Sequence, residues 1–315
     1  MINPVVLVLP DIHGRDFYKD ALKEAVESGI DIVCLGDYLD PYPYEELHEG
    51  GVSRPLKELI ALKKEHPHKI HLLIGNHDSS YMFHPSMCRS RYDILNGPIY
   101  TGLFQKNALS FDLFFDTNIA GKRFLFSHAG ITSRWLSAVG KGNLDQTLQW
   151  MKTGLMEFCL DRTKDEVWGY LAHIGEERGG NSQSGSIIWA DFFEHMDKSN
   201  WLDDENLIQV VGHTQFNILF INLLPQEPEF TTADILCISD FGWTILDKEV
   251  EELIQKEKDK GMVFYGLAVG TGKWMGFHHE DAINYCDSKW QWINGECVNI
   301  DDKCKKSEGG CVDIL

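Results

Sequence analysis

The chain has 315 residues and a formal net charge of −19; 43% of its residues are hydrophobic and 24% are charged. A chain of this length can bury a large core as one domain or two, and its composition is that of an ordinary globular protein. The acidic excess, without any stripe of Lys and Arg, argues against a nucleic-acid backbone as the main partner.

The apolar runs are too short to suggest a membrane protein. None approaches the ~20 residues of a transmembrane helix, and residues 5–9 are too few for the core of a signal peptide. We therefore expect no membrane association and a cytoplasmic location.

The eight cysteines lack the C-x2-C spacing of a structural zinc site, so we expect free thiols. Four of them fall in the last thirty residues, where a disulfide or metal clip is the alternative.

The first part of the chain alternates between two patterns. Apolar runs at residues 5–9, 32–35 and 70–74 predict buried strands, and amphipathic stretches at 17–27 and 55–65 predict helices between them. Alternation of strand and helix at this spacing predicts parallel strands joined by right-handed crossovers. The fold class is therefore α/β.

The rest of the chain is less regular. A strand at 124–126 is followed by a mostly helical insertion at about 132–206, for which a role as a cap over the site and simple packing both remain open. Further strands are expected at 208–211, 218–223, 235–238 and 243–246, then a charged helix at 248–260 and a turn-rich extension at about 262–315. No repeat or linker divides the chain, so we expect a single domain over residues 1–315.

Residues of the types that bind hard metal ions follow five of the predicted strands. The segments are Asp11-Ile12-His13-Gly14, Gly36-Asp37-Tyr38-Leu39-Asp40, Gly75-Asn76-His77-Asp78, Ser127-His128-Ala129-Gly130 and Gly212-His213-Thr214. Open α/β sheets bind their ligands at the carboxyl ends of the strands, so these loops are expected to meet. One segment alone would be a weak signal, but five in order predict the centre of a two-metal hydrolase.

The residue types suggest how the ligands divide between two ions. Asp11 and His13 are two residues apart in an extended segment, which places both side chains on one side of the chain. A carboxylate can bridge two ions about 3.5–4 Å apart, and Asp37 is suited to that place. One ion then takes Asp11, His13 and Asp37, and the other takes Asp37, Asn76, His128 and His213. This mixture of N and O ligands without thiolate suits Mn, Fe, Zn or Ni, and geometry alone does not choose between them. We expect two divalent ions, with Mn²⁺ first.

The ordered set of motifs resembles the calcineurin-like metallophosphoesterases, and within them the branch of the phosphoprotein phosphatases and symmetrical dinucleoside tetraphosphatase. The motifs span residues 11 to 214. The resemblance implies a four-layer α/β/β/α sandwich of two mixed sheets flanked by helices, and the same two sets of metal ligands. It also implies that His77 is a general acid or transition-state stabiliser for the leaving oxygen, and that Asp40 orients it.

The chain departs from that branch where the branch has arginines that hold phosphate. Pro41 follows Asp40 where an Arg is usual, and Ile74 precedes Gly75 where another Arg is usual. Bidentate guanidinium groups suit phosphate, so other arginines are expected to replace them. Arg54, in the loop after Asp40, and Arg134, just after His128, are our candidates for substrate binding. Other arginines near the motifs also come into consideration: Arg15, Arg89 and Arg91.

The function expected from these residues is hydrolysis of a phosphoester by in-line attack of a hydroxide that bridges the two metal ions. The substrate would be a small phosphoester, a nucleotide or a phosphoprotein. Two alternatives remain: a pyrophosphohydrolase of dinucleoside polyphosphates, and a catalytically silent phosphate-binding scaffold. The complete set of ligands argues against a silent scaffold. The sequence does not fix the oligomeric state.

Overall fold

The computed structural model describes residues 6–42, 47–84, 91–119, 121–204 and 206–214, and beyond these the backbone of strands between residues 218 and 299. The charged helix predicted at 248–260 lies outside the described residues, and so does Arg89. Within the described residues, no helix combines the length and apolar character needed to cross a membrane. A cytoplasmic location stays a prediction.

The first sheet has five strands in the order β10-β1-β2-β3-β4. Its strands are β1 (Val6–Leu9), β2 (Asp31–Cys34), β3 (Ile70–Leu73), β4 (Phe111–Asp112) and β10 (Thr244–Leu246). Strands β1 to β4 are parallel, and β10 runs antiparallel to β1 at the edge. The crossovers contain α1 (Lys19–Ser28) and α2 (Arg54–Glu65), which confirms the parallel arrangement predicted from the alternation.

The second sheet has seven strands in the order β12-β11-β8-β9-β7-β6-β5. They are β5 (Phe114–Ile119), β6 (Lys122–Ser127), β7 (Leu207–Val211), β8 (Ile218–Asn222), β9 (Asp234–Cys237), β11 (Phe264–Ala268) and β12 (Lys273–Phe277). Strand β7 is parallel to both β6 and β9, whereas the other pairs are antiparallel, so this sheet is mixed.

The C-terminal region contains more regular structure than the sequence suggested. Strands β11 and β12 extend the second sheet, and β13 (Trp290–Ile293) pairs with β14 (Glu296–Asn299) in a separate hairpin. The sequence predicts a turn-rich extension over residues 262–315. Strand formation depends on the neighbouring strand more than on intrinsic preference, and β8 supplies that neighbour for β11.

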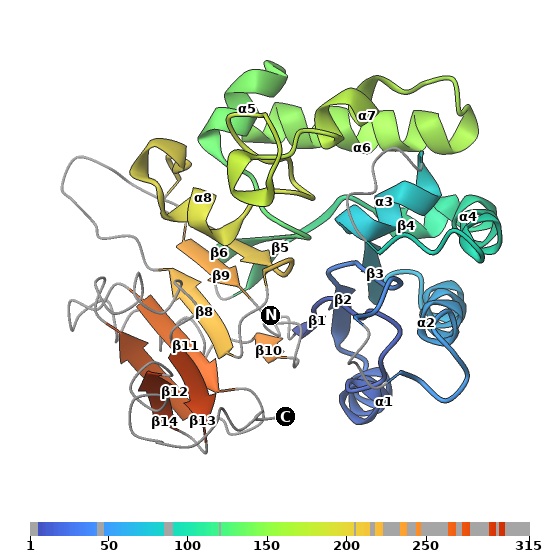
Figure 1. The fold of residues 1–315 in the computed structure, drawn as a ribbon, viewed down its shortest axis with the longest axis horizontal. Helices are drawn as coiled ribbons and strands as arrows, with labels where there is room; N and C mark the ends of the chain where they lie inside the picture. The colour runs from blue at the N-terminus through green and yellow to red at the C-terminus, as the bar shows by residue number, and fades with distance from the viewer. Residues whose placement is uncertain are drawn as a thin grey trace, which may run out of the picture.

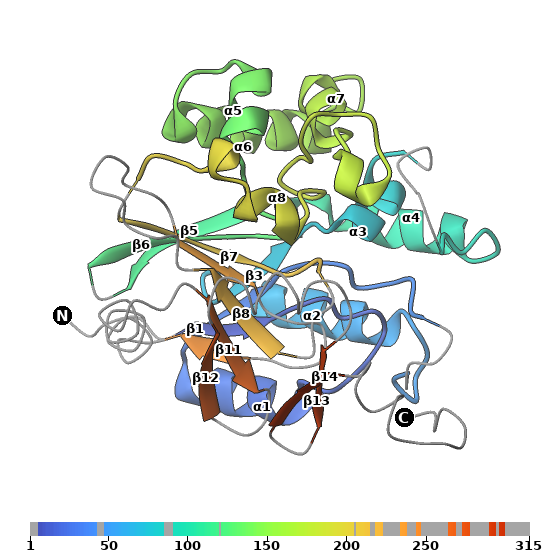
Figure 2. The same ribbon diagram turned by 60° about the vertical axis from the view of Figure 1, so that its left-hand side comes forward.

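Helices cover the outer sides of the two sheets. The remaining helices are α3 (Asn76–Met82), α4 (Gly97–Lys106), α5 (Ser133–Val139), α6 (Leu144–Leu160), α7 (Glu166–Leu171) and α8 (Phe192–Met196). Helices α1 and α2 lie on the side of the first sheet that faces away from the second sheet (Figure 1). Helices α5, α6 and α7 lie beyond the second sheet (Figure 2). The fold is therefore α/β, with two sheets between layers of helices.

Local signals fix where several helices begin and end. Thr132 caps α5 by accepting a hydrogen bond from the Trp135 amide at 3.1 Å. Asn143 and Gln146 exchange side chain to backbone bonds of 3.0 Å at the start of α6, the reciprocal pattern of a capping box. Helix α1 ends at Gly29, which adopts the left-handed conformation that glycine tolerates best.

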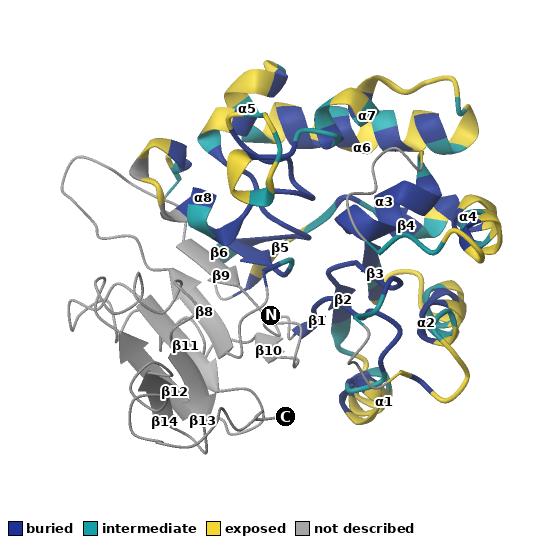
Figure 3. Ribbon diagram, viewed as in Figure 1, coloured by how far each residue is buried: buried dark blue, intermediate teal, exposed yellow. Residues whose placement is uncertain are grey.

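Strands β1, β2, β3 and β7 are buried along almost their whole length, whereas helices such as α1, α2 and α6 bury only one face (Figure 3). Leu7, Ile32 and Leu72 of the first sheet belong to the same apolar cluster as Trp135 of α5 and Met151 of α6. The helical insertion thus packs into the main core instead of forming a separate one. We propose on this basis that the chain is a single domain.

Candidate metal centre

The loops after β1, β2 and β3 come together through their backbones. The amides of His13 and Gly14 donate to the carbonyls of Asp37 and Tyr38 at 2.7 and 2.9 Å. Gly36 has a φ of 116°, a conformation that side chains other than hydrogen rarely adopt, and a Cβ there would collide with the Gly75 amide. The second and third loops can approach this closely only because glycine stands at this contact.

The first group of ligands contains Asp11, His13 and Asp37, whose ligand atoms all lie within 4.8 Å of one another. All three side chains are buried. His13 Nδ1 donates to the Leu39 carbonyl at 2.7 Å, so its Nε2 is left as the acceptor nitrogen. A ring fixed in this way through its other nitrogen is the usual arrangement of a histidine that binds a metal ion.

The second group contains Asp37, His128 and His213 within the same 4.8 Å limit. His128 Nδ1 donates to the Leu35 carbonyl at 3.0 Å, so Nε2 is again the free acceptor. That nitrogen lies 2.8 Å from Asn76 Oδ1 and 3.0 Å from His213 Nδ1. Potential ligand atoms of Asn76, His128 and His213, from three different loops, therefore lie close together.

Asp37 is the residue that the two groups share. Its Oδ1 accepts the His77 amide at 2.9 Å, which orients the carboxylate. Its Oδ2 lies 3.9 Å from His13 Nε2 and 3.6 Å from His128 Nε2. One oxygen of Asp37 thus faces an acceptor nitrogen of each group, the position required of a bridging ligand.

The side chains of the centre combine buried carboxylates with neutral imidazoles, an arrangement that bound cations would stabilise. Burial raises the pKa of Asp37 well above its usual value, and the neighbouring carboxylates of Asp11 and Asp78 raise it further. Burial lowers the pKa of His13, His128 and His213. The imidazoles therefore stay neutral, the form in which they can bind a metal ion. The Arg178 guanidinium lowers the pKa of His213 further. Buried carboxylates beside neutral imidazoles are stable when cations compensate them, so the donor set fits divalent metal ions.

Asp78 holds the loops of the centre together, a role that the sequence did not reveal. Its Oδ2 accepts the amides of Asp37 at 2.7 Å and Gly75 at 2.9 Å, and its Oδ1 accepts the amide of Tyr38 at 3.0 Å. The side chain is fully buried, and burial raises its pKa to about 7 against the effect of these donors. Its place in the Gly-Asn-His-Asp segment was the available signal.

We expect Asp78→Asn to lower the free energy of unfolding by about 1–3 kcal/mol, because one of the three amides would face an NH₂ group and lose its acceptor. The midpoint of urea denaturation measures this effect. Asp16→Asn, on the surface beside Lys19, is the matched control and should change the midpoint little. An unchanged midpoint in Asp78→Asn would contradict the proposed clamp.

His77 and Asp40 form a pair at the edge of the centre. His77 Nδ1 lies 2.9 Å from Asp40 Oδ2, and Tyr81 donates its hydroxyl to the other oxygen of Asp40. Since the Asp40 carboxylate accepts, the proton of the neutral His77 ring sits on Nδ1, and Nε2 points away from Asp40. The His77 and His13 rings lie 5.5 Å apart, so the pair borders the first group of ligands.

The structure places the two substrate-binding candidates at the surface. Arg54 pairs with Glu58 on α2 at 2.6 Å, and Arg134 contacts Ser199 and Asp197. Among the described residues, neither arginine contacts a residue of the two ligand groups.

Three other arginines lie at the centre. Arg15 donates to the carbonyls of Asp11 and Ile12. Arg178, in the insertion, donates to the carbonyl of His213 at 3.2 Å. Arg91 Nη2 lies 3.1 Å from His77 Nε2. Arg178 carries no local sequence signal, because it approaches the centre only through the folding of the insertion.

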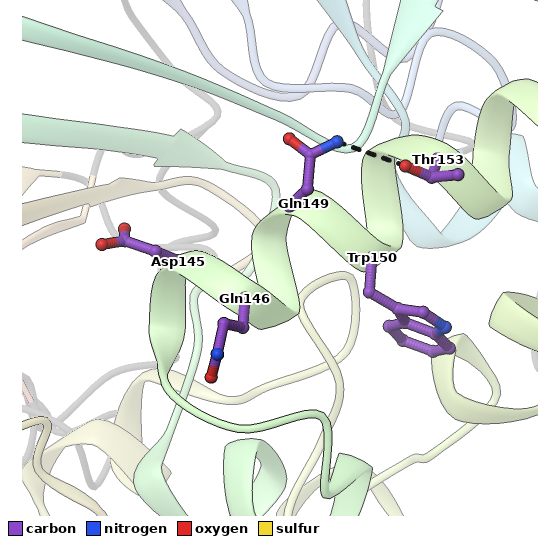
Figure 4. Close-up of a pocket in the computed structure, with 5 residues that line it drawn as sticks. All are labelled: Asp145, Gln146, Gln149, Trp150 and Thr153. Carbon is purple, nitrogen blue, oxygen red and sulfur yellow. Dashed lines mark hydrogen bonds between the residues drawn. The ribbon is translucent and has the colours of Figure 1, made fainter.

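The insertion also carries an open surface hollow of about 660 Å³. Its lining consists of Asp145, Gln146, Gln149, Trp150 and Thr153, all of α6. The five side chains spread from successive turns in different directions (Figure 4). Trp150 is in contact with Tyr170, edge to face at 5.3 Å, and with Lys141. One helix without an opposing wall does not make a nucleotide site.

Comparison of the chain with solved structures finds remote relatives. A serine/threonine phosphatase from Saccharomyces cerevisiae with similarity to human PP5 shares 15% identity over 75% of this chain and 67% of its own, with a TM-score of 0.37. The phosphoesterase YfcE from E. coli shares 16% identity over 78% of this chain and 88% of its own, with a TM-score of 0.33. A metallophosphoesterase from Sphaerobacter thermophilus shares 14% identity over 82% of this chain and 94% of its own, with a TM-score of 0.31. These scores are below 0.5, so they carry no assignment by themselves.

The family assignment comes from the sequence. No curated protein matches the chain significantly. The family model of the calcineurin-like phosphoesterases matches residues 4–266, which include both groups of ligands and His77. The chain therefore belongs to the calcineurin-like phosphoesterases and is a phosphoester hydrolase.

Proposed function

We propose that this phosphoesterase binds two divalent metal ions, Mn²⁺ first among them, and hydrolyses phosphomonoesters. The observation that carries the proposal is the position of Asp37 Oδ2 between His13 Nε2 and His128 Nε2, at 3.9 and 3.6 Å. Asp11 and His13 would hold one ion with Asp37. Asn76, His128 and His213 would hold the other with the same carboxylate. When bound, such ions activate water as a nucleophile at neutral pH and neutralise charge on the phosphoryl group.

The protein's own groups then act on the leaving oxygen. His77 is the proposed catalytic residue, and its Nε2 is the nitrogen that gives a proton to that oxygen. Asp40 Oδ2 accepts a hydrogen bond from His77 Nδ1 at 2.9 Å and stabilises the ring when it carries two protons. Tyr81 donates to the second oxygen of Asp40 and keeps the carboxylate in place.

The substrate remains one of three kinds: a small phosphoester, a nucleotide or a phosphoprotein. The alternative of a dinucleoside polyphosphate would need a surface that stacks a base beside the metal centre, and neither of the two hollows that Trp150 lines includes a residue of the ligand groups. The alternative of a silent scaffold would be favoured by a missing ligand. All six predicted ligand residues are present, and five of them belong to the two compact groups, while Asn76 contacts His128.

The proposal predicts turnover that depends on added metal. Metal-stripped protein is assayed with p-nitrophenyl phosphate and bis-p-nitrophenyl phosphate, with and without Mn²⁺, and the bound metal is counted by mass spectrometry. We expect activity only with metal, about two ions per chain, and faster hydrolysis of the monoester. Absence of turnover of both substrates in protein that holds two ions would contradict the proposed phosphomonoesterase.

A further inference from the structure

Arg91 shares an uncommon backbone conformation with the residues of the centre. Among the described residues other than glycine, positive φ angles occur at His13 (47°), Asp37 (50°), Asp40 (59°), Arg91 (57°) and His213 (66°). Such angles are rare for residues with a side chain and persist where the surroundings enforce them. Four of the five belong to the metal centre or the His77–Asp40 pair. Arg91 is the fifth, although the motifs do not include it.

The contacts of Arg91 fix its guanidinium beside His77. Nη1 donates to the Asp40 carbonyl at 2.7 Å, and Nη2 lies 3.1 Å from His77 Nε2. The guanidinium also stacks on the ring of Tyr42, with Cζ 3.4 Å from the ring centroid. Each terminal nitrogen carries a second N–H in the plane of the fork, which a ligand can accept.

The position of this cation matters because His77 Nε2 is the nitrogen that faces the reacting group. Arg91 Nη2 is 3.1 Å from that nitrogen, so a group bound next to His77 Nε2 also lies next to the guanidinium. A phosphoryl oxygen that lies beside both groups can accept the second N–H of Arg91 Nη2, and the planar fork matches the geometry of phosphate oxygens. The described arginines of the motif regions are otherwise engaged: Arg15 with the Asp11 carbonyl, Arg54 with Glu58 and Arg134 with Asp197.

We propose that Arg91 binds a non-bridging phosphoryl oxygen of the substrate and thereby favours phosphomonoesters over phosphodiesters. The inference rests on the proposed function. A monoester dianion offers Arg91 an unsubstituted, charged oxygen. A diester carries one negative charge less and a second ester group, so it forfeits part of this charge-assisted pairing. Arg91 thus takes the place of the clamp that is absent after Asp40 and before Gly75.

The test compares Arg91→Gln and Arg91→Lys with Arg123→Gln. Arg123 pairs with Asp116 at the start of β6, at the opposite end of that strand from His128, and serves as the matched control. In Arg91→Gln we expect kcat/KM for p-nitrophenyl phosphate to fall about 10- to 100-fold, the usual effect of losing a hydrogen bond to a charged group. For bis-p-nitrophenyl phosphate the fall should stay within about threefold. Arg91→Lys should keep part of the monoester preference because it keeps the charge.

A binding measurement separates this inference from the proposed function. Inorganic phosphate is titrated into Mn²⁺-loaded protein by calorimetry, and the dissociation constant should rise about tenfold or more in Arg91→Gln, with bound metal unchanged. Equal losses on monoester and diester together with unchanged phosphate affinity would overturn the inference and assign Arg91 to support of the Asp40 loop. Wild-type protein that binds phosphate through Arg91 but hydrolyses neither ester would overturn only the proposed function.

Discussion

Asp37→Asn is expected to lower kcat/KM for p-nitrophenyl phosphate by about 10³-fold or more, since it removes several kcal/mol of metal-dependent stabilisation. Asp37 is the one residue in both groups of ligands. The amide oxygen of asparagine can still reach one ion but carries no charge, and the NH₂ group cannot act as a ligand. Both ions should therefore bind more weakly, in contrast to the loss of a residue that serves a single ion.

The same variant should not lose thermal stability in the absence of metal, in contrast to its loss of activity. Without metal, Asp37 is a buried carboxylate whose pKa is raised by burial and by Asp11 and Asp78. Replacing it with a neutral side chain relieves this repulsion, so the midpoint of thermal unfolding of metal-free Asp37→Asn should equal or exceed that of the wild type. The gain in midpoint on adding Mn²⁺ should be lost, because stabilisation by a ligand follows its affinity for the folded state.

Asp20→Asn, on the exposed face of α1, is the control. It should keep both the activity and the rise in unfolding midpoint on adding Mn²⁺. Bound metal is counted in each variant by mass spectrometry. A variant Asp37→Asn that retains two ions and the wild-type gain in midpoint would show that Asp37 is not the bridging ligand.

The sequence could predict the metal centre because the rule that locates it is local. Each candidate ligand stands one to four residues beyond a buried strand, and parallel strands of a sheet bring their carboxyl ends together whatever the loops contain. Asp11, Asp37 and Asn76 follow β1, β2 and β3 in this way, and His128 and His213 follow β6 and β7. The sequence predicts all five of these strands, and helices α1 and α2 between the first three, within a few residues of their ends.

The substrate side of the site could not be predicted in the same way. Arg54 and Arg134 were chosen because they follow motif loops along the chain. Both lie in the first turn of a helix, however, and Arg54 pairs with Glu58 four positions further on, as helical geometry favours. Arg91 is fourteen residues beyond His77 in the chain, yet its Nη2 lies 3.1 Å from His77 Nε2. Position along the chain is a poor guide where a loop and not a strand delivers the side chain.

His77→Ala is expected to lower kcat for a phosphomonoester by about 10²- to 10⁴-fold, the usual contribution of a general acid. The metal content should not change. The ring of His77 is not part of either ligand group, and its amide, which orients Asp37 at 2.9 Å, is retained in alanine. The variant thus separates proton transfer from metal binding.

The leaving group decides whether His77 is an acid or a support for its neighbours. A p-nitrophenolate ion leaves without much help from a proton, whereas phenolate or an alkoxide needs one. His77→Ala should therefore lose more activity on phenyl phosphate than on p-nitrophenyl phosphate. Asp40→Asn should show the same order with a smaller loss, because the ring stays in place but its second proton is no longer stabilised by the carboxylate 2.9 Å away. If His77 only supports the loop of Asn76, both esters should lose activity equally and metal should be lost with them.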